Sequence, residues 1–191
     1  LAETPGSGLN GHSLWKYTYV SGTGTGSGGT WVNRSTNMPA FGGSVGNFDS
    51  QGSYDLVIKV KPDNENAVFI GGTNLYRSTD GFATKNNIAW IGGYSTDNDI
   101  SQYKFHHPDQ HSLAFNPNNA AELYSGHDGG ISKTADCLAP SVQWLFKNNG
   151  YLTTQFYTVA FNEITGNDNR LVGGLQDNGT WWTTTSAGAT P

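Results

Sequence analysis

The stretch HHPDQHSLAFNPNNAAELYSGHDGGI, residues 106–131, contains the pattern that predicts the fold. Leu113 and Phe115 alternate with smaller or polar residues, as in a β-strand with one buried face. A turn rich in asparagine and proline follows at 116–119, and a second short apolar run at 123–124 leads toward a glycine. Short strands joined by tight turns therefore organise this part of the chain.

The same order of strand, turn, strand and glycine occurs in two further places. One copy begins at Tyr54 and reaches Gly72, and another begins at Val159 and reaches Gly174. Repeats of about 40 to 50 residues with four short strands are typical of β-propeller blades. We therefore predict an all-β fold with blades of four antiparallel strands, about three to four blades of a larger propeller. The predicted boundaries are a loop or linker at 1–13, the end of a preceding blade and its connector at 14–53, and propeller blades over 54–191, approximately 54–105, 106–156 and 157–191, the last one incomplete.

Composition agrees with this class. The 26 Gly suit tight turns, and the nine Tyr, nine Phe and six Trp favour strands. The net charge of −5 and the lack of a basic run argue against nucleic acid as a partner, because phosphates need clustered cations. No apolar run approaches the roughly 18 residues of a membrane span. Cys137 has no partner for an internal disulfide, and Leu1 in place of an initiator methionine indicates a piece of a longer protein.

Two short strings place an aspartate in a predicted turn. STDG at 78–81 is followed by Thr84, and TAD at 134–136 is a weaker copy. They resemble the Asp-box, or bacterial neuraminidase repeat, in which the acidic side chain accepts backbone hydrogen bonds and glycine supplies a positive φ. Phe82 stands where that motif usually has a second glycine. A structural role is predicted for the matching residues, which are Ser78, Asp80, Gly81, Thr134 and Asp136.

Longer strings extend the resemblance over residues 54–182. They are HPDQHSLAFNP at 107–117, GHDGGISKTAD at 126–136, WLFKNNGYLTTQFYTVAF at 144–161 and GGLQDNGT at 173–180. In this order they resemble the Asp-box propellers of secreted bacterial proteins described as sortilin-like or glycosyl-hydrolase-like. The resemblance implies a β-propeller at the cell surface or in the medium, although that fold hosts many unrelated functions.

His107, Asp109 and His111 form the first group of candidate site residues. Spaced i, i+2 and i+4, they would project from one face of a strand, where two imidazoles and a carboxylate suit Zn²⁺ or another divalent ion. A divalent metal ion is therefore the one cofactor that the sequence suggests. Pro108 restricts such a strand to a start or an edge. The alternatives are structural hydrogen bonding by the histidines and a catalytic role.

Asp128 and Asp177 form the second group. Each follows the glycine of its repeat, so the two carboxylates are expected to be neighbours at one propeller face. Paired carboxylates are what glycoside hydrolysis requires. In some xyloglucan-cleaving proteins that the chain resembles, a similar Asp-x-Gly-Gly string carries a catalytic acid, to which Asp128 corresponds, and its partner lies in a second propeller. The alternative is that both residues stabilise tight turns.

Trp181 and Trp182 are candidate ligand-binding residues. Adjacent residues of a strand point to opposite faces, so we expect one of the two rings to be exposed. An exposed flat ring suits the face of a pyranose, whereas a covered ring fills the space between blades.

Together these features favour a secreted, non-catalytic β-propeller that acts as a binding or structural module at the cell surface or in extracellular material. Its predicted partners are the remainder of a larger propeller or other chains of an assembly, and a polysaccharide. The alternative is a glycoside hydrolase fragment, similar to xyloglucanases, that uses Asp128 and Asp177. The sequence leaves open whether the protein is an enzyme.

Overall fold

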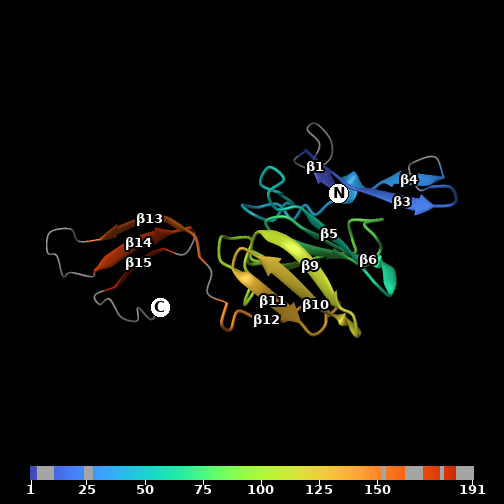
Figure 1. The fold of residues 1–191 in the computed structure, drawn as a ribbon. Helices are drawn as coiled ribbons and strands as arrows, with labels where there is room; N and C mark the ends of the chain where they lie inside the picture. The colour runs from blue at the N-terminus through green and yellow to red at the C-terminus, as the bar shows by residue number, and fades with distance from the viewer. Residues whose placement is uncertain (4–10, 24–27, 152–153, 162–169, 177–178, 184–191) are drawn as a thin grey trace. The chain divides into compact units, whose positions relative to one another are not determined.

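The computed structural model describes residues 1–3, 11–23, 28–151, 154–161, 170–176 and 179–183 (Figure 1). The chain divides into two compact units, Leu1–Asn148 and Asn149–Pro191. The described residues form β-strands and turns, with a short 3-10 helix, η2, at Ser35–Asn37. The predicted all-β class is therefore confirmed. In the part of the chain that the structure describes, no helix has the length and apolar character needed to cross a membrane.

Two four-stranded antiparallel sheets form the centre of the first unit. The first sheet contains β5 (Val57–Lys61), β6 (Asn64–Gly71), β7 (Leu75–Ser78) and β8 (Ile88–Gly92). The second sheet contains β9 (Gln110–Asn116), β10 (Asn119–His127), β11 (Gly130–Thr134) and β12 (Trp144–Phe146). In both sheets each strand pairs with the next one along the chain, as the repeat pattern predicts.

The first sheet buries side chains on both of its faces. Residues alternate between the two faces of a strand, so Phe69 and Ile70 of β6 enter different cores. Ile70 lies opposite Tyr76 of β7, and both pack under the N-terminal segment with Phe48. These side chains are fully buried, which accounts for the nearly continuous apolar run of β6.

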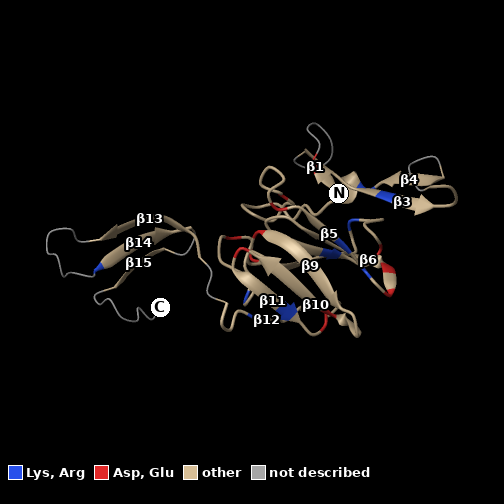
Figure 2. Ribbon diagram, viewed as in Figure 1, with Lys and Arg blue, Asp and Glu red and all other residues tan. Residues whose placement is uncertain are grey.

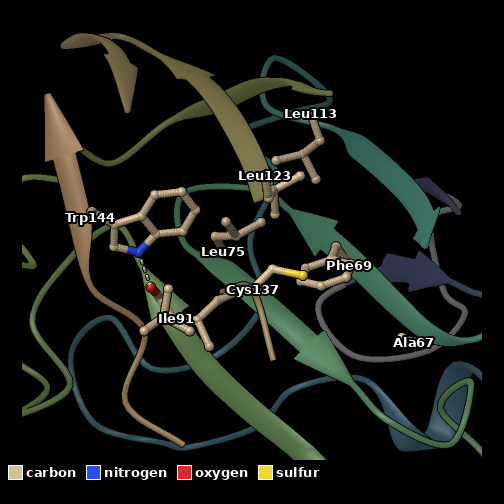
Figure 3. Close-up of a cluster of buried hydrophobic side chains, with 9 residues drawn as sticks. Ala67, Phe69, Leu75, Ile91, Leu113, Leu123, Cys137 and Trp144 are labelled. Atoms are coloured by element: carbon tan, nitrogen blue, oxygen red, sulfur yellow. Dashed lines mark hydrogen bonds between the residues drawn. The ribbon is translucent and has the colours of Figure 1, made fainter. Parts of the chain in front are cut away.

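The core between the two sheets is apolar and contains the single cysteine. Figure 3 shows Phe69, Leu75 and Ile91 of the first sheet directed toward Leu123 and Trp144 of the second. The remaining buried members are Ala67, Leu113, Cys137 and Val142. Burying a large apolar side chain contributes about 1.5 to 3 kcal/mol, so this interface is a major source of stability in the unit.

Polar contacts also cross between the two sheets. The indole N–H of Trp144 donates to the carbonyl of Ile91 at 2.6 Å. The guanidinium of Arg77 donates to the carbonyls of Cys137 and Ala139 at 2.7 and 3.0 Å. These bonds satisfy buried polar groups and fix how the sheets are oriented on each other.

The N-terminal segment differs in part from the expectation. Residues 1–13 were predicted to be a loop, but β1 (Ala2–Glu3) and β2 (His12–Ser13) pair as short antiparallel strands. In the segment after them, predicted as the end of a preceding blade and its connector, β3 (Trp15–Tyr19) and β4 (Gly29–Asn33) form a two-stranded antiparallel sheet. The two-residue strands β1 and β2 were missed because a strand of two residues is too short to show a period.

The second unit contains one three-stranded antiparallel sheet among its described residues. Its strands are β13 (Phe156–Phe161), β14 (Leu171–Leu175) and β15 (Thr180–Thr183), again paired in chain order. The close approach of β13 and β14 depends on Gly173, where a Cβ would lie 2.4 Å from the ring of Phe156. The sheet repeats the first three strands of the two sheets in the first unit.

The turn after β7 has the hydrogen bonds that its sequence predicts. Oδ1 of Asp80 accepts from the hydroxyl of Ser78 at 2.9 Å and the N–H of Ala83 at 3.0 Å. Oδ2 accepts from Thr84 Oγ1 at 2.7 Å and Asn87 Nδ2 at 2.9 Å. Partial burial disfavours the carboxylate, but these hydrogen bonds outweigh it and lower the pKa of Asp80 to about 2.

Phe82 occupies a strained position in this turn. It stands where a glycine was expected, and its φ of 58° lies in the left-handed region, which costs a non-glycine residue about 1 to 2 kcal/mol. Its ring is fully buried in the core under the N-terminal segment, and its N–H donates to Ser78 Oγ at 2.8 Å. Burial of the ring offsets the strain, so the departure from the motif has a physical reason.

The inter-sheet core can be tested with Leu123→Ala. Truncation of this fully buried side chain should lower the free energy of unfolding, measured with urea, by about 2 to 5 kcal/mol. Ile131→Ala is the control, because Ile131 lies on the neighbouring strand and is 40% exposed; its loss should be about 1 kcal/mol or less. Equal losses in the two variants would contradict this account of the core.

The turn predicts a pH dependence of stability. The pKa of Asp80 is about 2 in the folded state and about 3.9 in an unfolded chain. Its contribution is therefore complete above about pH 4 and declines as the pH falls toward about 2. Asp80→Asn should destabilise the protein at neutral pH and reduce this acid sensitivity, as measured by thermal unfolding. Asp136→Asn should change less, since Asp136 in the second turn accepts a backbone bond from Leu138 and is exposed.

Candidate functional site

An acidic cluster surrounds His111 where β5 and β9 begin. Asp55 precedes β5, and Asp109 directly precedes β9, which contains His111 as its second residue. Asp128 lies in the turn between β10 and β11, and its N–H donates to the carbonyl of Asp109 at 3.2 Å. Figure 2 shows acidic segments close to these strands. The edge strands β5 and β9 are neighbours in space, so residues far apart in the sequence meet here.

His111 lies between two carboxyl groups. Its Nε2 is 2.5 Å from Oδ1 of Asp128, and its Nδ1 is 3.8 Å from Oδ1 of Asp55. An ionised carboxylate only accepts hydrogen bonds, so Nε2 of His111 carries a hydrogen and donates it to Asp128. The ring of Tyr54 stands edge-on to the imidazole, with 5.1 Å between centroids. Tyr54 and His111 are exposed, and they form the outer part of the cluster.

Asp55 is the buried member of the cluster. Its side chain has no exposed surface. The amide Nε2 of Gln51 donates to Oδ2 of Asp55 at 2.8 Å and to Oδ1 of Asp109 at 2.5 Å. Oδ1 of Asp55 has no hydrogen-bond partner. A buried polar atom without a partner is costly, about 1 to 3 kcal/mol, so this oxygen is an unusual feature of the fold.

The surroundings of Asp55 favour its neutral form. Burial has the largest effect, and the charge and hydrogen bonding of Asp109 act in the same direction. The charge of Asp128 adds to this, whereas His111 opposes it. The pKa of Asp55 is consequently raised to about 7. A carboxyl group that changes charge near neutral pH, beside a histidine and two further carboxylates, is characteristic of functional sites.

Strained backbone supports the cluster. Gln51, Ser53 and Asp109 have φ values of 49°, 68° and 66°, in the left-handed region that non-glycine residues rarely adopt. Two of these three residues belong to the hydrogen-bonded network that holds Asp55. The surrounding contacts therefore hold the loop in a shape that its residues do not favour on their own.

The structure does not bring His107, Asp109 and His111 together as a metal site. The prediction required one strand, but β9 begins only at Gln110, and the positive φ of Asp109 interrupts the alternation of side chains. The imidazole of His107 contacts the carbonyl of Pro108 through Nδ1 at 3.0 Å, whereas His111 binds Asp128. Among the described residues, no group of three or more histidine, cysteine, aspartate or glutamate side chains is placed to hold a metal ion.

Two of the buried histidines, His106 and His127, have structural hydrogen bonds. The N–H of Gly93 donates to Nδ1 of His106 at 2.9 Å, so the ring hydrogen of His106 is on Nε2. Ser132 Oγ donates to the carbonyl of Phe105 at 2.8 Å and accepts from His127 Nε2 at 2.8 Å, which leaves Nδ1 of His127 bare. Burial, followed by the neighbouring histidines, lowers the pKa of His127 to about 4 and that of His106 well below its usual range. Both rings are therefore neutral at physiological pH.

The remaining predicted residues have different outcomes. Asp128 belongs to the cluster, but Asp177 lies outside the described residues, so their pairing stays a prediction. Trp181 and Trp182 lie opposite Gly173 and Val172 in the second unit. Their exposed fractions within the described structure are 46% and 72%, so both rings are exposed rather than one.

Sequence reasoning missed Asp55, Gln51 and Tyr54. These residues follow one another closely in the string DSQGSYD at 49–55, which looks like an ordinary polar connector before a strand. One available signal was an acidic residue immediately before an apolar alternating run, but the same pattern occurs in many turns. The role of Asp55 depends on its contact with β9, which is more than 50 residues later in the chain.

Comparisons with known proteins give a distant structural likeness. No protein-family model matches the chain, and no curated protein matches its sequence. Among solved structures, the crystal structure of the GH74 enzyme of Niastella koreensis aligns with a TM-score of 0.49 and 20% sequence identity. The alignment covers 92% of this chain and 25% of that chain, so the present chain spans about a quarter of its length.

Asp55 predicts an unusual pH dependence. Its pKa is about 7 in the folded state and about 3.9 in an unfolded chain, so between these values the folded state binds more protons. Its contribution to stability therefore declines as the pH rises from about 4 to about 7. In Asp55→Asn, the free energy of unfolding relative to the wild type should increase across this interval and then level off. The control is Asp97→Asn, since Asp97 is exposed, and its free energy of unfolding should differ from that of the wild type by the same amount at every pH. A pH-independent difference for Asp55→Asn as well would contradict the raised pKa of Asp55.

Proposed function

We propose that this chain is part of a secreted β-propeller that acts as a non-catalytic binding module for a polysaccharide at the cell surface or in extracellular material. The repeated design supports the propeller. Two sheets have four antiparallel strands in chain order, and they pack face to face. Blades of a propeller have this strand order and packing. The likeness of the sequence to sortilin-like repeat proteins supports secretion.

The proposed module requires further partners on its apolar faces. The second sheet covers the first with one face, and its other face carries Ile131 and Leu145, which are 40% and 56% exposed within the described residues. In a propeller each blade is covered by neighbours on both faces. The remainder of a larger propeller, or another chain of an assembly, is the partner that fits these faces.

The observation that carries the binding role is the exposed group of Tyr54, His111 and Asp128. Tyr54 is 64% exposed and stands edge-on to His111, whose Nε2 contacts Asp128. The carboxylate of Asp128 can accept hydrogen bonds from a ligand. Polysaccharides supply donors from their hydroxyl groups, and their flat rings suit an exposed aromatic side chain such as Tyr54.

One observation favours the alternative, a glycoside hydrolase. Such enzymes use a carboxylic acid of raised pKa and an ionised carboxylate on either side of the scissile bond. Asp55, whose pKa is about 7, and Asp128 are separated by the ring of His111. In this alternative Asp128 keeps the role predicted for it, and Asp55 takes the place of Asp177.

Binding and hydrolysis can be separated with one panel of polysaccharides. The full chain should retard on native gels that contain its ligand, and it should release no reducing ends from that ligand. Asp55→Asn and Asp128→Asn should weaken retention, while Asp97→Asn should leave it unchanged. If the wild type releases sugar and Asp128→Asn does not, the hydrolase is the correct function and the non-catalytic binding module is rejected. Retention that is equal in all variants would place the ligand elsewhere on the chain.

A further inference from the structure

His106 lies at the joint between the two four-stranded sheets. Its fully buried ring packs on Gly92 at the end of β8, where an added Cβ would lie 2.5 Å from Nδ1. The same ring contacts two side chains of the second sheet, with 4.2 Å between ring centroids to Trp144 and 4.8 Å to His127. Trp144 belongs to the apolar core between the sheets. The imidazole is therefore held by both sheets at once.

The hydrogen bonds of His106 and His127 require neutral rings. The N–H of Gly93 donates to Nδ1 of His106 at 2.9 Å, and an imidazolium cannot accept this bond because both of its nitrogens carry hydrogens. Nε2 of His106 and Nδ1 of His127 are buried without a hydrogen-bond partner. In the tautomers described above, the first is a donor and the second an acceptor. Protonation of His127 would make both atoms donors.

The groups around the two rings disfavour a positive charge. The titratable groups that act on the pair are His107, which acts on both rings, and His111, which acts on His127, with no carboxylate among the described residues that do so. Asp128 follows His127 in the chain but contacts Nε2 of His111. Burial, followed by these like charges, lowers the pKa of both buried rings. The closed joint therefore excludes the protons that an exposed histidine would bind in mild acid.

We propose that His106 and His127 form a pH-sensitive switch at the joint: the two sheets stay in contact while both rings are neutral, and they separate when the rings take up protons. Tyr54 precedes the first sheet, whereas His111 and Asp128 come from the second. Opening in acid would thus also separate the exposed group that the proposed function uses. That last consequence rests on the proposed function, whereas the switch itself needs no ligand.

The switch should act below about pH 6.5, the pKa of a histidine in an open chain. Above this pH neither state binds these protons, so the contact has its full stability. As the pH falls toward about 4, the open state binds two protons that the closed state excludes, which favours opening about tenfold per pH unit for each ring. Asp55 acts in the opposite direction over the same interval, because the closed state binds its proton. Substitution of the histidines separates the two effects.

The test compares His106→Asn and His127→Gln with the wild-type full chain between about pH 6.5 and pH 4.5. The Asn amide can accept from Gly93, the Gln amide can donate to Ser132, and neither titrates. Over this interval the unfolding constant in urea should rise about a hundredfold less in each variant than in the wild type. Leu123→Ala is the control, because it weakens the same core without removing a titratable group, and its unfolding constant should exceed that of the wild type by one factor at every pH.

Amide hydrogen exchange of the wild-type chain, corrected for the pH dependence of the exchange chemistry, locates the opening. The N–H groups of Gly93 and Gln110 donate across the joint, to Nδ1 of His106 and to the carbonyl of Gly72. Their protection should fall in mild acid. The amides that pair β6 with β7 should stay protected, because these strands also pack under the N-terminal segment.

The remaining outcomes are each decisive. An equal pH dependence in the wild type and both histidine variants would overturn the switch, and so would loss of protection in β6 and β7 together with the joint. Absence of polysaccharide retention in the gel panel, combined with the expected pH response, would support the switch and reject the proposed function. Should His106→Asn fail to fold, His127→Gln decides, together with the imidazole nitrogen spectrum of the wild type. Charged rings at both positions in the folded protein near about pH 5.5 would contradict the proposal.

Discussion

Burial of apolar side chains between the two four-stranded sheets is the interaction on which the rest of the first unit depends. Trp144 and Leu123 enter this interface from one sheet, and Phe69 and Leu75 enter it from the other. The contact sets how the sheets are oriented, and it therefore places the edge strands β5 and β9 next to each other. The acidic cluster exists only because of that placement, since its residues come from loops that share no local contact in the sequence.

The fold could be predicted from the sequence because its signals are local. Alternation and short apolar runs indicated the strands of the repeats, and glycine marked the ends of strands. The turn that holds Asp80 follows from the chemistry of a short acidic side chain, which is why its hydrogen bonds were expected. The strands of 1–13 were missed, because pairing of two-residue strands comes from tertiary contact rather than from a pattern.

The candidate site was only partly predictable, because it depends on contacts between residues far apart in the sequence. The histidines and aspartates of 106–131 drew attention to His111 and Asp128, but the metal-site prediction assumed that 107–111 forms one regular strand. The positive φ of Asp109 breaks that assumption; aspartate adopts this region more often than most residues, but too rarely for the sequence to predict it at one position. Asp55 was missed because the charged groups that act on its pKa, Asp109, His111 and Asp128, come from parts of the chain far away in the sequence. Features that conflict with local rules are where function is commonly found.

Within the first unit, the first sheet is covered on both faces, whereas the second sheet is covered on one face only. This difference affects the cooperativity of unfolding. Stacked sheets that contact only their neighbours behave as a one-dimensional array, in which stability is a sum of internal and nearest-neighbour interactions. The first sheet, with Phe69 and Ile70 in two different cores, has two such neighbour interactions. Its amide hydrogens should therefore exchange with solvent through the largest opening of the unit, while the outer edges open in smaller and more frequent fluctuations. The loop that contains Asp55 joins the N-terminal covering segment to the first sheet, so the site lies at the boundary between these two regimes.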